Sequence, residues 1–222
     1  MDRVDCLDHG FVRLIDSMGS DLSIVRAARV SHDAAWRAGE DTASDTKLIR
    51  YLWRNHHTTP FEAVTLTFEA KAPIFVFRQW HRHRTWSYNE LSARYRELPE
   101  EFYVPERSKI TLQSEINKQA RTNEQHPNAE NMRMLMMATN ANAFRNYKLM
   151  LEEGVPRELA RTVLPVATYS HMFATVNLLN LFRLLTLRVD EHAQYEIRVY
   201  ANAMRDLTRA IVPVAVGAWE AP

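Results

Sequence analysis

The stretch VTLTFE, from Val64 to Glu69, decides the expected fold, because its apolar and polar residues alternate strictly. A period of two is typical of a strand with one buried face and one polar face. Pro73 follows and suits the first turn of a helix, so a helix is expected from Ile74 to about Arg82. Strand and helix therefore follow one another closely, which indicates a domain that mixes the two.

Outward from this strand, the sequence predicts more helix than strand. Other extended segments are expected over 11–18, 166–172 and 102–105. Helices are expected over 21–35, from Ser44 or Asp45 to about 56, within 113–153 around a polar interruption at 122–128, from 156 to 164, and over 177–188 and 191–211. Residues 87–96 are expected to be irregular, and the expected core includes Met132, Leu135, Met136 and Ala143.

The composition is that of a globular protein without a global attraction for polyanions. The chain has 222 residues, 46% of them hydrophobic and 25% charged, and a net charge of +1. That balance argues against a partner such as nucleic acid or an anionic membrane. The single cysteine, Cys6, excludes an internal disulfide and a multi-cysteine zinc site. We therefore expect a cytoplasmic protein in which this thiol is buried and inert.

One uncharged run is long enough to suggest a membrane span. No Asp, Glu, Lys or Arg occurs from Thr162 to Phe182. Pro165, Ser170 and His171 interrupt its apolar character, however. A buried strand followed by the start of a helix is expected there, and no membrane span.

The segment from Arg78 to Tyr95 holds the densest mixture of arginines and aromatic residues. Guanidinium groups offer planar forks of donors that fit phosphate oxygens, and aromatic rings offer flat faces that exclude water. A phosphorylated ligand that contains a ring would use both. The five glycines permit neither GxGxxG nor GxxxxGK, so arginines, hydroxyls and helix N-termini must hold any phosphates. The alternative is a solvated basic helix face.

Four histidines also raise the question of a metal site. His56 and His57 are adjacent, and His81 and His83 are two residues apart on a predicted helix. Side chains at that spacing point about 200° apart, which suits a single ion poorly. No metal is therefore expected.

Two later segments place arginines on shared helix faces. Arg157 and Arg161 are one turn apart at the start of a predicted helix, where they either meet an anion or are solvated. Asn177 and Arg188 flank an apolar stripe on another helix and point the same way. The helix dipole alone would also account for an arginine at the C-terminal end.

The pattern Arg82-His83-Arg84, followed after seven residues by Ser92, is similar to the signature of flavin-dependent thymidylate synthases. The resemblance covers nearly the whole chain, through the stretches 27–31, 59–62, 71–75, 155–157, 187–188 and 192–194. It implies a homotetramer with active sites shared between subunits. It also implies bound FAD, with NADPH as reductant, 5,10-methylenetetrahydrofolate as carbon donor and dUMP as acceptor.

The fold class that follows is mixed α/β, or α+β, in a single domain over residues 1–222. A central, mainly antiparallel sheet with a large helical part is expected. By the resemblance, the flavin contacts are Ser31, Thr59, Arg82, His83, Arg84, Thr85, Glu90 and Asn177. The dUMP contacts are Gln79, Glu90, Ser92, Arg94, Arg161 and Arg188.

Arg188 is expected to be the catalytic residue. A permanent cation at the edge of the uracil ring stabilises charge as C5 becomes nucleophilic. Ser92 is expected to bind phosphate, because a serine without a histidine base is a weak nucleophile. His57 is expected to position the flavin.

This chain departs from the family pattern at two positions. Many relatives carry arginine where Leu179 stands, and Asn or His where Arg183 stands. The two positions are one helical turn apart, so Arg183 is expected to supply the missing charge to FAD. Two other classes stay open from the residues alone, namely a nucleotide- or RNA-binding module and a histidine metal hydrolase.

Overall fold

The computed structural model describes residues 3–221 and is built on a five-stranded antiparallel sheet. The strand order is β1 (Arg3–Cys6), β2 (Gly10–Met18), β3 (Thr65–Pro73), β7 (Tyr169–Asn177) and β4 (Ser87–Glu90). Every neighbouring pair runs antiparallel. The expected mixture of helices with a mainly antiparallel sheet is therefore confirmed.

Strands β3 and β7 form the centre of the sheet. They pair from Thr65 opposite Asn177 to Pro73 opposite Tyr169 without a register shift. Leu66 and Phe68 are buried, as the alternation in the sequence predicts. The polar residues between them turn to the other face of the sheet, where Thr67 Oγ1 lies 3.0 Å from Thr175 Oγ1.

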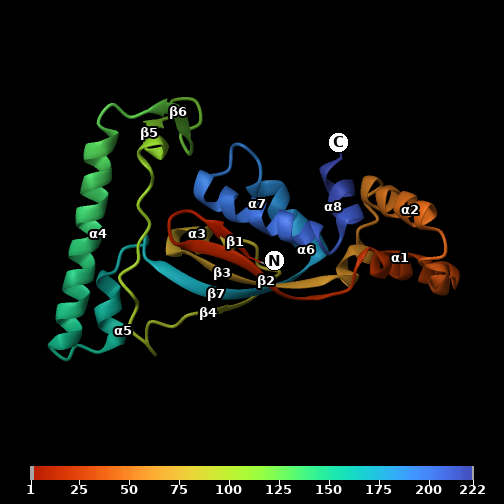
Figure 1. Ribbon diagram of the computed structural model, residues 1–222, viewed down its shortest axis with the longest axis horizontal. Coiled ribbons are helices and arrows are strands. Elements are labelled where there is room, and N and C mark those ends of the chain that lie inside the picture. The colour runs from red at the N-terminus through yellow and green to blue at the C-terminus, as the bar shows by residue number, and fades with distance from the viewer. Residues whose placement is uncertain (1–2, 222) are drawn as a thin grey trace.

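Helices cover only one face of this sheet. Helix α3 (Ile74–Trp80), α6 (Leu178–Arg188) and α7 (Tyr195–Arg209) lie on it in Figure 1. The predicted apolar stripe of α6 is confirmed, because Leu181 and Leu184 are fully buried. Among the described residues, no helix packs against the opposite face (Figure 1).

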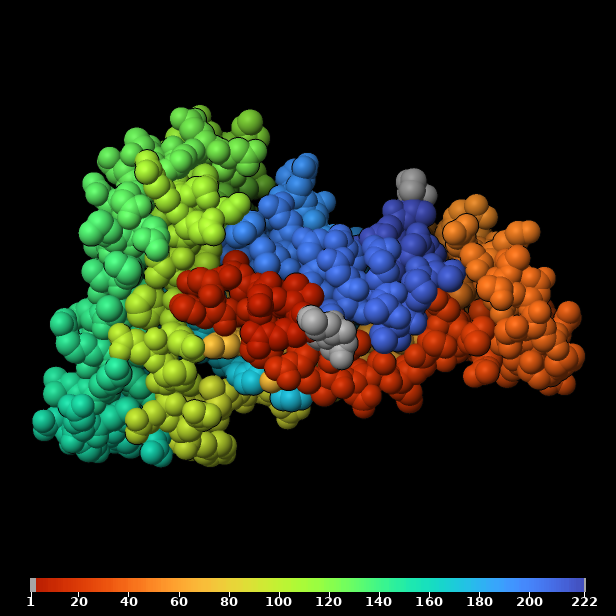
Figure 2. Space-filling model, viewed as in Figure 1, coloured from red at the N-terminus to blue at the C-terminus, as the bar shows by residue number. Residues whose placement is uncertain are grey.

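The remaining helices extend the molecule at its two ends. Helices α1 (Asp21–Arg29), α2 (Thr42–Arg54) and α8 (Pro213–Glu220) gather at one end, and α4 (Ala129–Glu152) and α5 (Arg157–Ala160) stand at the other. The hairpin of β5 (Thr111–Gln113) and β6 (Arg121–Gln125) lies beside α4. Figure 2 shows these ends as an orange and a green-to-teal mass, with the blue C-terminal helices between them.

Five short 3-10 helices complete the described chain. They cover Val30–His32, Ala35–Arg37, Thr59–Ala63, Arg107–Lys109 and Arg161–Val163. Two of them continue a helix beyond its α-helical part, since Val30 follows α1 and Arg161 follows α5. The helix expected over 21–35 is therefore shorter and more broken than its pattern indicates.

Several boundaries differ from the sequence-based expectation. Residues 87–90 are a strand and not irregular, because β7 offers a free edge with which they pair. The strand expected over 166–172 lies at 169–177, so Asn177 ends the strand and caps α6 instead of lying within the helix. Strand β1 and helix α8 were not predicted.

The long helical region is also different. A hairpin occupies 111–125, and the helix begins only at Ala129. Leu135 and Met136 are 59% and 43% exposed, so their expected place in the core is wrong for the single chain. Phe144 and Tyr147 hold α4 through a small separate cluster with Ala160 of α5.

The uncharged run from Thr162 to Phe182 divides into a loop, strand β7 and the first turns of α6. Between residues 3 and 221, no helix is both long and apolar enough to cross a membrane.

Helix α2 begins one turn earlier than expected, and its cap can be tested. The Asp41 carboxylate accepts a hydrogen bond from the backbone nitrogen of Ser44 at 3.0 Å. Asp41→Ala is expected to lower the free energy of unfolding by about 1 kcal/mol, because an N-terminal amide loses its acceptor. Asp41→Asn keeps the acceptor oxygen and is the matched control in urea titrations. Equal losses in both variants would contradict the capping role.

Candidate active site

A cavity of about 510 Å³, which we call the arginine cavity, brings together the predicted dUMP ligands Glu90, Ser92 and Arg161 with Arg78, which was not predicted as a ligand. Arg78 comes from α3, Glu90 and Ser92 from the end of β4, and Arg161 from the 3-10 turn after α5. Apolar side chains line the rest of the cavity, among them Ile74, Leu91, Leu98, Leu164 and Val166. Thr162 and Ser170 also line it, and a few polar or charged groups on an apolar wall are typical of a small-molecule site.

Pairing of β4 with β7 places Glu90 at this cavity. The hydroxyl of Ser170 donates to Glu90 Oε1 at 2.7 Å, and the nitrogen of Leu91 donates to the carbonyl of His171 at 2.7 Å. The strand therefore holds the glutamate by both its side chain and its backbone. Ser92 follows directly, where the chain leaves the sheet.

The charge of the arginine cavity is uncompensated by ion pairs. Within residues 3–221, neither Arg78 nor Arg161 forms an ion pair. Two such guanidinium groups beside a serine hydroxyl form a strong site for a phosphate or another anion. No histidine lines the cavity, so its described residues offer Ser92 no imidazole base, and the Glu90 carboxylate there already accepts from the Ser170 hydroxyl.

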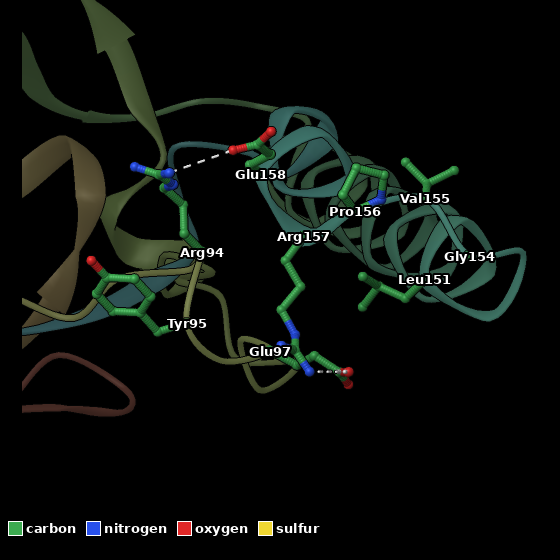
Figure 3. Close-up of a pocket in the computed structure, with 9 residues that line it drawn as sticks. All are labelled: Arg94, Tyr95, Glu97, Leu151, Gly154, Val155, Pro156, Arg157 and Glu158. Carbon is green, nitrogen blue, oxygen red and sulfur yellow. Dashed lines mark ion pairs between the residues drawn. The ribbon is translucent and has the colours of Figure 1, made fainter.

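Arg94 lies in a neighbouring cavity of about 500 Å³, between the segment after β4 and the start of α5 (Figure 3). In Figure 3, Arg94 and Glu158 point toward one another, and so do Arg157 and Glu97. These ion pairs measure 3.6 Å and 3.7 Å, and all four side chains are largely exposed. Exposed pairs of this kind are weak, so Arg94 can exchange Glu158 for an anionic ligand at little cost.

Arg188 and His83 meet on the helical side of the sheet. Arg188 Nε donates to His83 Nε2 at 3.2 Å, and Arg188 Nη2 donates to the carbonyl of Gln79 at 3.4 Å. A guanidinium has only donors, so Nε2 must accept and the proton of the neutral ring lies on Nδ1. His83 therefore offers an N–H donor on its other side.

Burial, and then the charge of Arg188, lowers the pKa of His83 from 6.5 to about 4. Burial, and then the charge of Arg82, lowers the pKa of Arg188, which still stays charged at neutral pH. At neutral pH the pair therefore consists of a cation and a neutral imidazole. A half-buried cation without an ion-pair partner is well suited to develop contacts with an electron-rich ring.

Gln79 adjoins this pair but faces a different neighbour. Its amide nitrogen donates to Gln194 Oε1 at 2.6 Å, at the start of α7. Gln79, His83 and Arg188 therefore form one group, here called the Arg188 cluster. No hydrogen bond or ion pair of the described residues joins this cluster to Glu90, Ser92 or Arg161.

The predicted flavin contacts Ser31 and Thr59 line a third cavity, of about 530 Å³, between α1 and α2. His57 lines the same cavity, as do Arg29 and Tyr51, which sequence reasoning did not single out. Arg29 is held in place by Asp45, whose carboxylate lies 2.6 Å from it. Only the periodicity of α2, with Leu48, Tyr51 and Leu52 on one side, could have indicated Tyr51.

Asn177 caps α6 at its N-terminal end, and Arg183 lies in the middle of that helix. Asn177 Oδ1 accepts from the nitrogen of Asn180 at 2.9 Å, and Arg183 donates to Asn180 Oδ1 at 2.9 Å. Leu179 is 5% exposed and packs in the core, whereas Arg183 reaches solvent. Position 179, where the family resemblance implies arginine, is therefore apolar and buried here, and the arginine stands one turn later, at position 183.

Arg82, Arg84 and Thr85 are exposed in the turn between α3 and β4. Neither arginine forms an ion pair within the described residues. The predicted flavin contacts are thus divided between this turn, the start of α6 and the α1–α2 cavity. Together they offer hydroxyls, an amide, free cations and aromatic walls, which is the donor set that a flavin nucleotide with its diphosphate requires.

The described residues, 3–221, contain no cluster of side chains suited to bind a metal ion. No group of three or more His, Cys, Asp or Glu side chains is placed to hold an ion there. Cys6 is buried, as expected, and burial raises the pKa of its thiol to about 12. A thiol in that state is a poor nucleophile at neutral pH.

Comparison with known proteins assigns this set of residues to a family. Residues 13–214 match the family model described as thymidylate synthase complementing protein. A flavin-dependent thymidylate synthase of Treponema denticola is 45% identical over 219 residues, which is 96% of this chain and 80% of that protein. One from Wolbachia pipientis is 44% identical over 214 residues, covering 96% of this chain and 74% of that protein.

A solved structure is similar over its whole length. It is the UMP/dUMP methylase PolB from Streptomyces cacaoi, bound with 5-Br dUMP. The TM-score is 0.89 and the identity 37%, and the match covers 97% of both chains. The same methylase bound with 5-Br UMP gives a TM-score of 0.85.

The state of His83 predicts a pH dependence of stability. The unfolded chain takes up this proton near pH 6.5, whereas the folded chain resists it until about pH 4. Stability is therefore expected to fall as the pH is lowered from about 6.5 to about 4, and to gain nothing from this group above that range. The effect is moderate, because the side chain is only partly buried and solvent screens its charge.

His83→Asn removes this titration and leaves the other groups in place. Urea titrations of both proteins at several pH values between 7.5 and 4.5 measure the difference. A smaller loss in the variant is expected at acid pH. The same pH slope in both proteins would contradict the neutral histidine.

Proposed function

This chain belongs to the thymidylate synthase complementing protein family, the flavin-dependent thymidylate synthases, and from that premise we propose that it methylates dUMP to dTMP with FAD bound. The carbon donor is 5,10-methylenetetrahydrofolate, the reductant is NADPH, and tetrahydrofolate is released. The arginine cavity carries this proposal, because it joins two guanidinium groups, which form no ion pair within residues 3–221, to a serine and a glutamate around an apolar wall.

Glu90, Ser92 and Arg161 bind dUMP in the arginine cavity, with Arg94 at its edge. The guanidinium groups and the Ser92 hydroxyl suit the phosphate, which is doubly charged near neutral pH. Arg94 joins them when a phosphate displaces Glu158 from its exposed ion pair. Ser92 acts as a ligand and not as a nucleophile, because no histidine base is among the described residues that line the cavity.

FAD is held by the residues that the structure divides among three segments. Arg82, His83, Arg84 and Thr85 come from the turn after α3, Asn177 and Arg183 from α6, and Ser31 and Thr59 from the α1–α2 cavity. Glu90 serves both ligands. A bound, reduced flavin supplies the hydride and the one-carbon relay that a thiolate-free route to dTMP needs.

Arg188 polarises the uracil ring. It is half-buried, stays charged and lies beside a histidine that is neutral at pH 7, and within residues 3–221 no ion-pair partner reduces its field. Held against a carbonyl edge of uracil, it stabilises the negative charge that makes C5 nucleophilic. His83 fixes the direction of the guanidinium by accepting from Nε.

We infer that complete sites form between copies in a homotetramer. The flavin cavity between α1 and α2 and the arginine cavity near α5 lie toward opposite ends of the sheet (Figure 1). One chain therefore cannot close both around one pair of ligands. A second copy supplies the missing half when it packs in the opposite orientation.

Two surfaces of the single chain support this assembly. The helix-free face of the sheet carries Phe173, which is 40% exposed, beside the partly buried carboxylate of Glu69. Glu69 is paired with Arg13 at 3.2 Å and with His171 at 2.7 Å. Helix α4 exposes a second set of large apolar side chains, Met134, Leu135, Met136, Met137 and Leu149. Apolar surface of this extent is typical of subunit contacts.

Arg188→Ala is expected to abolish dTMP formation while the protein keeps FAD. Loss of a preorganised cation costs on the order of 100-fold or more in turnover. Flavin absorbance of the purified variant reports cofactor retention, and single-turnover dTMP formation reports chemistry. Arg188→Lys keeps a charge without the fork and should recover only part of the rate. Near-normal turnover of Arg188→Ala would refute the catalytic role.

Arg183→Ala is expected to weaken FAD binding. An exposed charge-assisted contact to a phosphate or ribose is worth roughly tenfold in affinity. Quenching of flavin fluorescence on titration into the apoprotein measures the dissociation constant. Arg183→Lys is the control that retains the charge. Unchanged FAD affinity in Arg183→Ala would show that this arginine does not replace the one absent at Leu179.

The reaction itself is tested anaerobically with 5,10-methylenetetrahydrofolate and NADPH, with and without FAD. We expect dTMP from dUMP only when FAD is present. UMP belongs in the same assay as a second acceptor, because the full-length match to a UMP/dUMP methylase favours it as an alternative substrate. Absence of both methylated products from FAD-loaded protein would refute the proposal.

A further inference from the structure

A buried carboxylate lies behind the Arg188 cluster. Glu196, in the first turn of α7, is 2% exposed. Its Oε1 accepts from the Tyr103 hydroxyl at 3.1 Å and from Arg121 Nη2 at 2.9 Å, and its Oε2 accepts from Gln194 Nε2 at 2.8 Å. Burial, and then the charge of Glu196, raises the pKa of Tyr103, so this hydroxyl keeps its proton and donates.

The carboxylate sets the direction of two amides in series. An ionised carboxylate only accepts hydrogen bonds, so Gln194 must turn its NH2 group toward Glu196. Its carbonyl oxygen then faces the other way, where it can only accept. Gln79 meets that oxygen at 2.6 Å and must therefore donate with its own NH2 group. The side-chain carbonyl oxygen of Gln79 then remains as the acceptor that faces the ligand.

We propose that Glu196 is a positioning residue for nucleotide recognition: through Gln194 it locks the Gln79 amide so that a carbonyl oxygen, and not an NH2 group, faces the base. This rests on the proposed function. A side-chain amide without such an anchor can rotate by about 180° and present either its oxygen or its NH2 group, so it accepts ligands with donors and ligands with acceptors alike. An anchored amide presents only one of the two groups and therefore selects for ligand donors or for ligand acceptors.

The acceptor identifies the ligand group that it receives. The hydrogen-bond donors of dUMP are the ring N3–H and the 3′-hydroxyl, and the phosphate dianion has none. Gln79 lies beside Arg188, whose Nη2 is 3.4 Å from the Gln79 carbonyl of the main chain. Arg188 supplies donors to the uracil oxygens, so the N3–H between those oxygens is the group that pairs with Gln79. Cytosine has no proton on N3, and its lone pair meets the Gln79 oxygen unfavourably.

The test measures dissociation constants for dUMP, dCMP and 2′,3′-dideoxyUMP on FAD-loaded protein by calorimetry. For the unmodified protein, the dissociation constant of dCMP is expected to exceed that of dUMP by about tenfold or more. One hydrogen bond to N3–H is lost with dCMP, and two lone pairs meet in its place. Glu196→Gln has the same shape but can donate, which lets Gln194 and Gln79 turn. Its preference for dUMP over dCMP should fall several-fold, while the ratio of its dissociation constants for dUMP and 2′,3′-dideoxyUMP stays the same.

Two further variants separate positioning from general damage. Gln194→Leu cuts the series at an exposed residue and should lower the base preference as Glu196→Gln does. Tyr103→Phe removes one neutral hydrogen bond from Oε1 and leaves Oε2 with Gln194, so its base preference should match that of the unmodified protein. Retained flavin absorbance shows that each variant is folded.

An unchanged preference for dUMP in Gln194→Leu would overturn the proposal even if Glu196→Gln proved too unstable to purify. A fall in the dideoxy ratio instead of the base ratio would also overturn it, because Gln79 would then read the sugar. Failure of the proposed function is a different result, in which the unmodified protein forms no dTMP. The two failures are therefore distinguishable.

Discussion

The nine-residue pairing of β3 with β7 is the constraint on which the rest of the molecule depends. At one end of the ladder, the nitrogen of Leu178 donates to the carbonyl of Val64 at 2.9 Å, which starts α6 beside the 3-10 turn that carries Thr59. At the other end, the nitrogen of Ile74 donates to the carbonyl of Thr168 at 3.0 Å, which starts α3 beside the arginine cavity. The register of one strand pair thus separates the two ligand sites.

Electrostatics then give the arginine cavity and the Arg188 cluster different chemistry. The arginine cavity gathers cations without ion-pair partners, which favours a phosphate. The Arg188 cluster pairs a cation with a neutral histidine, which leaves the field of Arg188 available to a ring. Glu196 is the anion of this region, yet it faces away from the site and acts through two amides. The negative charge of Glu196 is therefore kept two residues away from the ligand and does not neutralise Arg188.

The sequence predicts those parts of this arrangement that depend on local pattern. The alternation over Val64 to Glu69 gives β3, and the spacing of Leu181 and Leu184 gives the buried stripe of α6. Strand β4 could not be predicted, because only the free edge of β7 makes residues 87–90 extended. The series from Glu196 to Gln79 joins residues 117 positions apart, or 196 minus 79, and no periodicity reports such a contact. Ser92 and Arg161 were predicted to bind the same ligand because of the family resemblance alone, since no spacing in the sequence links them.

The proposed function depends most on an active site that is completed between copies of the chain. Mixing two inactive variants tests this shared site most directly. Arg188→Ala lacks the cation at the ring, and Arg161→Ala lacks a guanidinium in the arginine cavity. Each should be inactive alone as a uniform oligomer. When the two are unfolded together and refolded with FAD, sites that combine an intact Arg188 with an intact Arg161 from another copy should form dTMP. A mixture as inactive as its components, although mixed oligomers are present by mass spectrometry, would contradict the shared site.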